Sequence, residues 1–193
     1  MNQTGVLPLF HSDIFIKKNV GTPTQRREIF MQIEKFKASS VDISMTNFGC
    51  WRSTREYEKI EWLIDTVLDL CHTAYNFYEH ADNIDRSNLS SSSFKIHYWT
   101  NVNAPGSRNA VHSHEKSHFS CVYYLEATNT GALRLINPAN LLGNCNPLAV
   151  FTRDFVFDPA DGDLILWPSW VPHEVEPNFS NKNRINITFD IFK

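Results

Sequence analysis

The sequence lacks the features that mark several common classes of protein. Its four cysteines include no C-x-x-C pair, which argues against a cysteine-bound zinc module and against a disulfide framework. No apolar run approaches the roughly 20 residues that a membrane-spanning helix needs. The N-terminus also lacks a basic segment followed by a long apolar one, so no signal peptide is expected. These absences predict a cytoplasmic protein with no membrane partner.

The net charge of the chain is also small. The formal net charge is −3 over 193 residues, which gives no electrostatic reason to expect nucleic acid as a partner. Apolar residues are plentiful, since 42% of the residues are hydrophobic and 13% are aromatic, as in a globular protein with a substantial core. This length predicts a single domain covering residues 1–193, and the sequence contains no internal repeat.

The spacing of the apolar residues changes near the middle of the chain. Residues 1–93 are a predicted helical support region. One helix is expected to start at the capping box Thr22-Pro23-Thr24-Gln25, and a second, ending near His80, at the capping box Ser53-Thr54-Arg55-Glu56. In residues 94–193 the period becomes two, which predicts eight strands, at 94–100, 109–114, 117–126, 131–136, 150–157, 163–167, 172–177 and 183–192.

This order of elements defines the expected fold class. It is α+β and mainly β, with the strands forming a β-sandwich or distorted barrel and the N-terminal helices packed on one sheet. Turn signals such as Pro105-Gly106 separate the predicted strands.

Three histidines predict a metal site. His112 and His114 are two residues apart in a predicted strand, so both side chains point to one face and can reach the same ion. His173 follows a rigid, proline-containing segment and supplies a third ligand, which leaves coordination positions open for substrate or oxygen. Non-haem iron oxygenases usually have two histidines and one carboxylate. Either His114 replaces that carboxylate, as strand parity favours, or a local bulge brings Glu115 to the metal.

Arg184 is the predicted anion-binding residue. It opens a run in which polar residues alternate with large apolar ones. One interpretation is an outer strand with its polar face in water. If the apolar face instead packs beneath the helices, Arg184 points into the barrel, and a buried guanidinium needs an anion. A carboxylate supplies one through a bidentate pair, and an inward-facing phenol from Tyr124 could share it.

Several segments of the second half resemble a known family. They are His112-x-His114, Ser120-Cys121-Val122-Tyr123-Tyr124-Leu125, Gly131-x-Leu133, Gly162-Asp163-Leu164-Ile165-Leu166-Trp167-Pro168-Ser169-Trp170, His173-x-Val175-x-Pro177-Asn178 and Arg184-Ile185. In this order they resemble the 2-oxoglutarate/Fe(II) oxygenases found in bacteria and in phages of marine cyanobacteria. They are more distantly similar to prolyl hydroxylases. The resemblance covers residues 94–193 well and residues 1–93 loosely.

The resemblance implies a double-stranded β-helix (jelly-roll) fold and a set of binding residues. Fe(II) would be held by the three histidines. The cosubstrate 2-oxoglutarate would chelate the iron through its keto-acid end. Its far carboxylate would pair with Arg184, assisted by Tyr124 and by Thr188, which shares the face of Arg184.

The expected function is that of a 2-oxoglutarate- and Fe(II)-dependent dioxygenase. Such an enzyme would use O2 to hydroxylate a substrate and would release succinate and CO2. The sequence leaves the substrate open between a small molecule and a peptide, and it does not indicate the oligomeric state. Two alternatives remain: a three-histidine cupin-type metalloenzyme that does not use 2-oxoglutarate, and a non-catalytic jelly-roll binding module.

Overall fold

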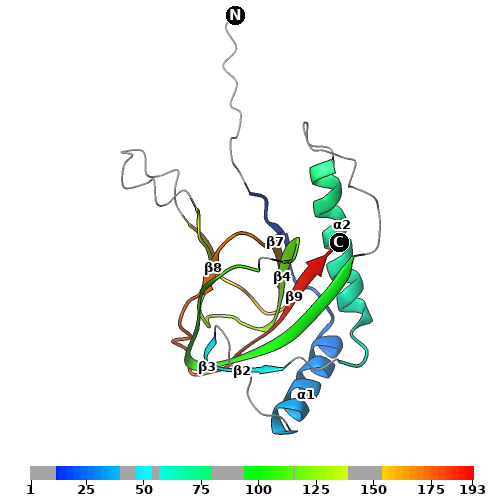
Figure 1. Ribbon diagram of the computed structural model, residues 1–193. Helices are drawn as coiled ribbons and strands as arrows, with labels where there is room; N and C mark the ends of the chain where they lie inside the picture. The colour runs from blue at the N-terminus through cyan, green and yellow to red at the C-terminus, as the bar shows by residue number, and fades with distance from the viewer. Residues whose placement is uncertain (1–11, 40–46, 54–56, 80–93, 115, 139–153) are drawn as a thin grey trace, which may run out of the picture.

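A computed structural model describes residues 12–39, 47–53, 57–79, 94–114, 116–138 and 154–193 (Figure 1). In chain order the elements are β1 (Phe15–Lys17), α1 (Pro23–Ser39), β2 (Asn47–Ser53), α2 (Glu61–Glu79), β3 (Lys95–His112), β4 (Phe119–Glu126), β5 (Leu133–Leu135), β6 (Phe155–Phe157), β7 (Leu164–Pro168), β8 (His173–Val175) and β9 (Arg184–Phe192). These ranges contain no helix with the length and apolar character needed to cross a membrane. The described part of the chain is therefore mainly β, as predicted.

The strands form one antiparallel sheet that curls around an interior. Their order is β1-β7-β4-β9-β3-β8-β5-β6, and β2 pairs with β3 as well. Strand β3 pairs with β9 along residues 95–103 and with β8 at its far end. Figure 1 shows β3 as a long curved strand that sweeps across the molecule. The curvature of β3 brings β8, which begins at His173, to the interior of the curled sheet.

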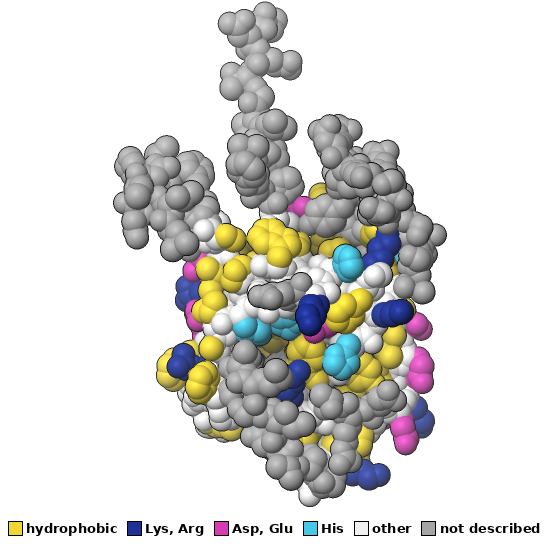
Figure 2. Space-filling view, in the orientation of Figure 1, with side chains coloured by type: hydrophobic (Ala, Val, Ile, Leu, Met, Phe, Trp, Pro, Cys, Tyr) yellow, Lys and Arg dark blue, Asp and Glu magenta, His cyan; other side chains and the backbone are white. Residues whose placement is uncertain are grey.

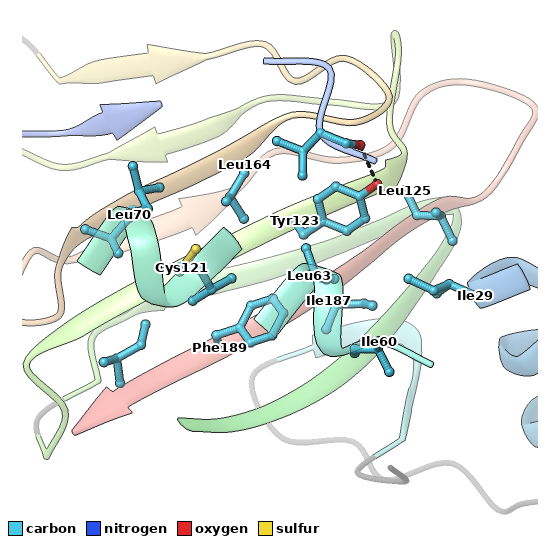
Figure 3. Close-up of a cluster of buried hydrophobic side chains, with 14 of the residues drawn as sticks. Ile29, Ile60, Leu63, Leu70, Cys121, Tyr123, Leu125, Leu164, Ile187 and Phe189 are labelled. Carbon is cyan, nitrogen blue, oxygen red and sulfur yellow. Dashed lines mark hydrogen bonds between the residues drawn. The ribbon is translucent and has the colours of Figure 1, made fainter. Parts of the chain in front are cut away.

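Polar and apolar residues alternate along β9, so the two kinds of side chain point to opposite sides of the sheet. Ile185, Ile187, Phe189 and Ile191 are at most 1% exposed and belong to a core that includes Leu63 of α2. Figure 3 shows the helix residues of this core facing the side chains of β9 and β4. The helices therefore cover the apolar face of β9, and the alternate residues point to the opposite side. The predicted packing of the N-terminal helices on one sheet is confirmed.

A second apolar cluster lies on the side away from the helices. It is built by β4, β5, β6 and β7 and includes Val122, Leu133, Ile165 and Trp167, each at most 8% exposed. These side chains form apolar walls next to the polar residues of β9. The sheet therefore has an interior in which polar groups are shielded from solvent, a condition that strengthens electrostatic interactions.

Helix α1 begins as the sequence predicts. The backbone N–H of Gln25 donates to Oγ1 of Thr22 at 3.3 Å, and the backbone N–H of Thr22 donates to Oε1 of Gln25 at 2.8 Å. This reciprocal pair satisfies two N–H groups that the helix leaves without partners. Pro23 occupies the first helical position, where no N–H is required.

The predicted start of the second helix is wrong. Ser53 is the last residue of β2, where it pairs with Thr100 of β3, and α2 begins only at Glu61. The first helical hydrogen bonds, of 2.8 and 3.0 Å, are accepted by the carbonyl of Ile60. Pairing with β3 therefore outweighs the local capping preference of Ser53, and residues 54–56 lie outside the described ranges.

Two of the predicted strands are one. The strands expected at 94–100 and 109–114 are joined in β3, which continues through the turn expected at Pro105-Gly106. Gly106 adopts a φ of 83°, a conformation that glycine takes without strain. Its N–H donates to the carbonyl of Asn178 at 2.7 Å, so a contact from a distant segment holds the backbone there.

Leu63 tests the packing of the helices on the sheet. Its side chain is 0% exposed, so Leu63→Ala should lower the free energy of unfolding by about 2–5 kcal/mol through lost burial and a residual cavity. Met31→Ala, at a position of α1 that is 62% exposed, is the matched control and should change it by less than about 0.5 kcal/mol. Urea denaturation followed by circular dichroism measures both. Equal losses in the two variants would contradict this packing.

Candidate metal centre and anion pocket

Strand pairing brings two of the predicted ligands together. His112, at the end of β3, is the register partner of His173, at the start of β8. Antiparallel partners lie directly opposite each other with their side chains on the same face. His114 follows two residues later, where its backbone N–H donates to the carbonyl of Ser169 at 3.1 Å.

The three imidazoles form one cluster. The ring centroids of His112 and His173 are 4.3 Å apart. The ring centroid of His114 lies 5.2 Å from that of His112 and 5.1 Å from that of His173. One nitrogen of each ring lies within 4.8 Å of the other two, so the three could hold a single metal ion. Figure 2 shows histidine side chains gathered near the centre of one face. Glu115, the alternative ligand, lies outside the described residues.

Hydrogen bonds at Nδ1 determine which ring nitrogen can bind a metal. The Nδ1 atoms of His112 and His173 lie 2.7 and 3.2 Å from the backbone carbonyl oxygen two residues earlier in the chain. A carbonyl oxygen only accepts, so each Nδ1 must carry the proton and donate it. Nδ1 of His114 is likewise hydrogen-bonded to the carboxylate of Asp190. In its neutral form, each of the three rings therefore leaves Nε2 unprotonated, which is the form that binds a metal ion.

The surroundings of His112 and His173 keep these two rings neutral. Burial lowers the pKa of His112. Burial, together with the neighbouring charge of His112, lowers the pKa of His173 to about 3. Because a histidine must be deprotonated to bind a metal, His112 and His173 can accept one at neutral pH without first losing a proton.

Arg184 is buried with part of its hydrogen-bonding capacity unused. Its side chain is 0% exposed, and burial lowers the pKa of its guanidinium. Nη1 donates to the carbonyl of Thr130 at 3.0 Å, whereas Nε and Nη2 have no hydrogen-bond partner among the described residues. These two nitrogens form one edge of the guanidinium, the edge that a carboxylate can bind with both oxygens. Since unused buried donors cost free energy, this edge suits an anionic ligand.

Tyr124 and Thr188, the two residues predicted to assist Arg184, have different surroundings. Burial raises the pKa of the Tyr124 phenol, and the nearby charge of Arg184 only partly offsets this, so the phenol stays protonated and can donate. Thr188 already belongs to a network of amides. Its Oγ1 accepts from Nδ2 of Asn101 at 3.1 Å and donates to Oδ1 of Asn186 at 3.3 Å.

A cavity of about 420 Å³ joins these groups. Its walls include the three histidines, Tyr124 and Thr188, together with the apolar side chains of Val122, Leu133 and Trp167. Arg184 is not among the described residues that line the cavity, but its charge acts on Tyr124, which does line it. The cavity thus connects the histidine cluster with Tyr124, the lining residue on which the charge of Arg184 acts.

Sequence reasoning did not assign three further lining residues, Arg52, Trp99 and Asp190, to the site. Arg52 lies over the Trp99 ring at 4.3 Å, and that ring stacks on His114 at 5.8 Å and 16°. Asp190 shares a face of β9 with Arg184, so strand parity could have identified it. Arg52 comes from β2, whose pairing with β3 has no local sequence signal.

Part of the chain matches a known protein family. Residues 97–190 match the family model described as "Putative 2OG-Fe(II) oxygenase". The matched region contains the three histidines, Tyr124 and Arg184. This region therefore matches the 2-oxoglutarate/Fe(II) oxygenase family, and the resemblance inferred from the sequence is confirmed. A comparison with curated protein sequences gives no match.

Solved structures of low sequence identity share the fold. A prolyl-4-hydroxylase from Pseudomonas putida superposes with a TM-score of 0.64 at 14% identity, covering 93% of this chain and 92% of that chain. A prolyl hydroxylase from Trichoplax adhaerens, in complex with a peptide fragment of the hypoxia-inducible factor, gives 0.63 at 15% identity, covering 93% and 83%. HygX from Streptomyces hygroscopicus, with nickel and 2-oxoglutarate bound, gives 0.61 at 9% identity, covering 94% and 83%. The predicted double-stranded β-helix is confirmed.

The lowered histidine pKa values predict how the stability of the metal-free protein depends on pH. Between the ordinary pKa of 6.5 and the value of about 3 for folded His173, the unfolded chain binds more protons than the folded one. The contribution of His173 to stability is therefore complete above pH 6.5 and is lost as the pH falls through this window.

His173→Asn should make the loss of stability between pH 6.5 and 3 smaller, because the substituted side chain does not titrate. Urea unfolding at a series of pH values, in the presence of a chelator, measures the free energy of unfolding of both proteins. The same pH dependence in wild type and variant would show that His173 is not held neutral by the fold.

Proposed function

We propose that the protein is a 2-oxoglutarate- and Fe(II)-dependent dioxygenase that hydroxylates a small-molecule or peptidyl substrate and releases succinate and CO2. One observation carries this proposal. A cluster of three histidines that could hold one metal ion shares an interior with a fully buried arginine that has an unused edge of donors. A metal ion matches the histidine cluster, and a cosubstrate with a carboxylate matches the arginine.

The histidine cluster fits Fe(II). His112, His114 and His173 would each offer Nε2, and their three ligand atoms leave part of the coordination sphere open. Bound iron and 2-oxoglutarate would together supply the activation of O2, with one oxygen atom entering the substrate and the other entering succinate. The chain itself fixes the tautomer and orientation of each ligand through the hydrogen bonds at Nδ1.

Arg184 fits the far carboxylate of 2-oxoglutarate. Its Nε and Nη2 would donate in parallel to the two carboxylate oxygens, the strongest geometry available to such a pair. The protonated phenol of Tyr124 would add a third donor from the cavity wall. Thr188 would contribute through the amide network it shares with Asn101 and Asn186.

Apolar walls suit the site to this chemistry. Val122, Leu133 and Trp167 line the cavity beside the histidines, and the indole of Trp167 packs edge-on against His173 at a centroid distance of 5.0 Å. Such walls exclude water, which strengthens the charge pairs inside and protects a reactive centre from side reactions. HygX, which is similar in fold, holds nickel and 2-oxoglutarate.

The three-histidine cluster also favours a second candidate, a cupin-type metalloenzyme that does not use 2-oxoglutarate. The unused donors of Arg184 argue for the first candidate, because the second provides no anion for them. Anaerobic addition of 2-oxoglutarate to the Fe(II)-loaded protein separates the two. The dioxygenase should develop the weak visible charge-transfer band of an iron–keto-acid complex, and the cupin-type enzyme should bind iron with no such band.

Arg184→Ala should nearly abolish turnover of 2-oxoglutarate. Losing one partner of a buried charge pair costs about 2 kcal/mol or more, which weakens cosubstrate binding by at least roughly 30-fold. Arg134→Ala is the matched control, since Arg134 pairs with Glu176 at 2.6 Å on the surface of β5 and should leave turnover unchanged. Succinate release with Fe(II), across a panel of amino acids, peptides and cell extract, measures the effect and searches for the substrate.

Two results would count against the proposal. One is wild-type succinate release from folded Arg184→Ala protein. The other is an equal loss in the Arg134→Ala control.

Tyr124→Phe removes only the phenol oxygen, and the loss of one hydrogen bond should raise the 2-oxoglutarate concentration needed for half-maximal turnover by roughly 2- to 10-fold.

A further inference from the structure

The carboxylate of Asp190 lies directly behind one of the candidate ligands. It is hydrogen-bonded to Nδ1 of His114, the ring nitrogen that faces away from the cluster. The two side chains are 18% and 10% exposed, so the pair is largely screened from water. An interaction between a carboxylate and an imidazole is stronger in such surroundings than at an exposed surface.

The position of Asp190 is set by the centre of the sheet. Strand β9 lies between β3 and β4, and Asp190 pairs with His97 on one side and with Ser120 on the other. A residue held in two ladders has little freedom to move. His114 is in turn held by its own backbone hydrogen bond and by the stacked ring of Trp99. The contact between Asp190 and His114 is therefore a fixed feature of the fold.

The charge of the ligand set explains why this contact matters. Two neutral histidines and one carboxylate reduce the charge of a divalent iron by one unit, whereas three neutral histidines leave it unchanged. A carboxylate hydrogen-bonded to the far nitrogen of a ligating histidine makes that ring a stronger donor and fixes its orientation. Asp190 is such a carboxylate, and it acts on the histidine that occupies the place expected for a carboxylate ligand.

We propose that Asp190 is a positioning residue that supplies negative charge to the metal centre through His114, in place of a carboxylate bound directly to the metal. This inference rests on the proposed function, because it requires a metal at the three histidines. It assigns a role to a residue of β9 that neither contacts the metal nor binds the cosubstrate.

The affinity of the full-length protein for Mn(II), which stands in for Fe(II) and needs no turnover, tests this role. Asp190→Asn keeps the shape of the side chain and removes its charge. It should weaken Mn(II) binding by roughly 10- to 100-fold, as loss of such an outer carboxylate does elsewhere. Free Mn(II), measured by electron paramagnetic resonance during a titration, gives the dissociation constant. Unfolding of the metal-free variant in urea checks that it remains folded.

A second background separates this role from a general effect on the fold. His114→Asp installs a carboxylate directly in the ligand set, so the charge from Asp190 is no longer required. In that background, Asp190→Asn should leave the dissociation constant for Mn(II) unchanged or improve it. Asp69→Asn is the matched control, since Asp69 is a carboxylate of α2 whose side chain is 77% exposed and which is not among the cavity-lining residues of the described chain. Removing that charge should not weaken Mn(II) binding.

Three outcomes would overturn the inference. Unchanged Mn(II) affinity in Asp190→Asn would show that the carboxylate is not needed. Equal weakening in the wild-type and His114→Asp backgrounds would show that Asp190 acts other than through His114. A wild-type protein that binds no Mn(II) would overturn the proposed function together with this inference, whereas either of the first two leaves the proposed function standing.

Discussion

The alternation of strand β9 is the constraint on which the rest of the structure depends. Its isoleucines and Phe189 are buried against the helices, and this packing forces Arg184, Thr188 and Asp190 to the opposite side. A shift of one residue in register would exchange the two faces and place the guanidinium in the apolar core. The hydrophobic effect on one side of the sheet thus determines which polar groups meet in the interior on the other.

That interior holds groups whose burial without a ligand costs free energy of folding. A buried arginine with two unused donors and three histidines side by side contribute little to the stability of the empty protein. Their arrangement is understandable as preparation for ligands, because an anion and a metal ion would satisfy both at once. The charges of such ligands would be opposite, and the cavity of about 420 Å³ beside the histidines also reaches Tyr124, on which the charge of Arg184 acts.

The sequence predicted those parts that rest on local periodicity. Parity placed His112 and His114 on one face, and the alternating run from Arg184 placed its polar residues together on one face of a strand. Pairing between distant segments escaped prediction, because β2 carries no signal that it lies beside β3 and brings Arg52 to the cavity. The same pairing explains the wrong start of α2, since Ser53 completes a strand instead of capping a helix.

A crystal structure of the protein grown with Mn(II) and 2-oxoglutarate tests the central claim most directly. We expect the metal bound by Nε2 of His112, His114 and His173. We expect the keto-acid end of the cosubstrate on the metal and its far carboxylate paired with Nε and Nη2 of Arg184. Metal bound away from the histidines, or 2-oxoglutarate bound without contact to Arg184, would contradict the account.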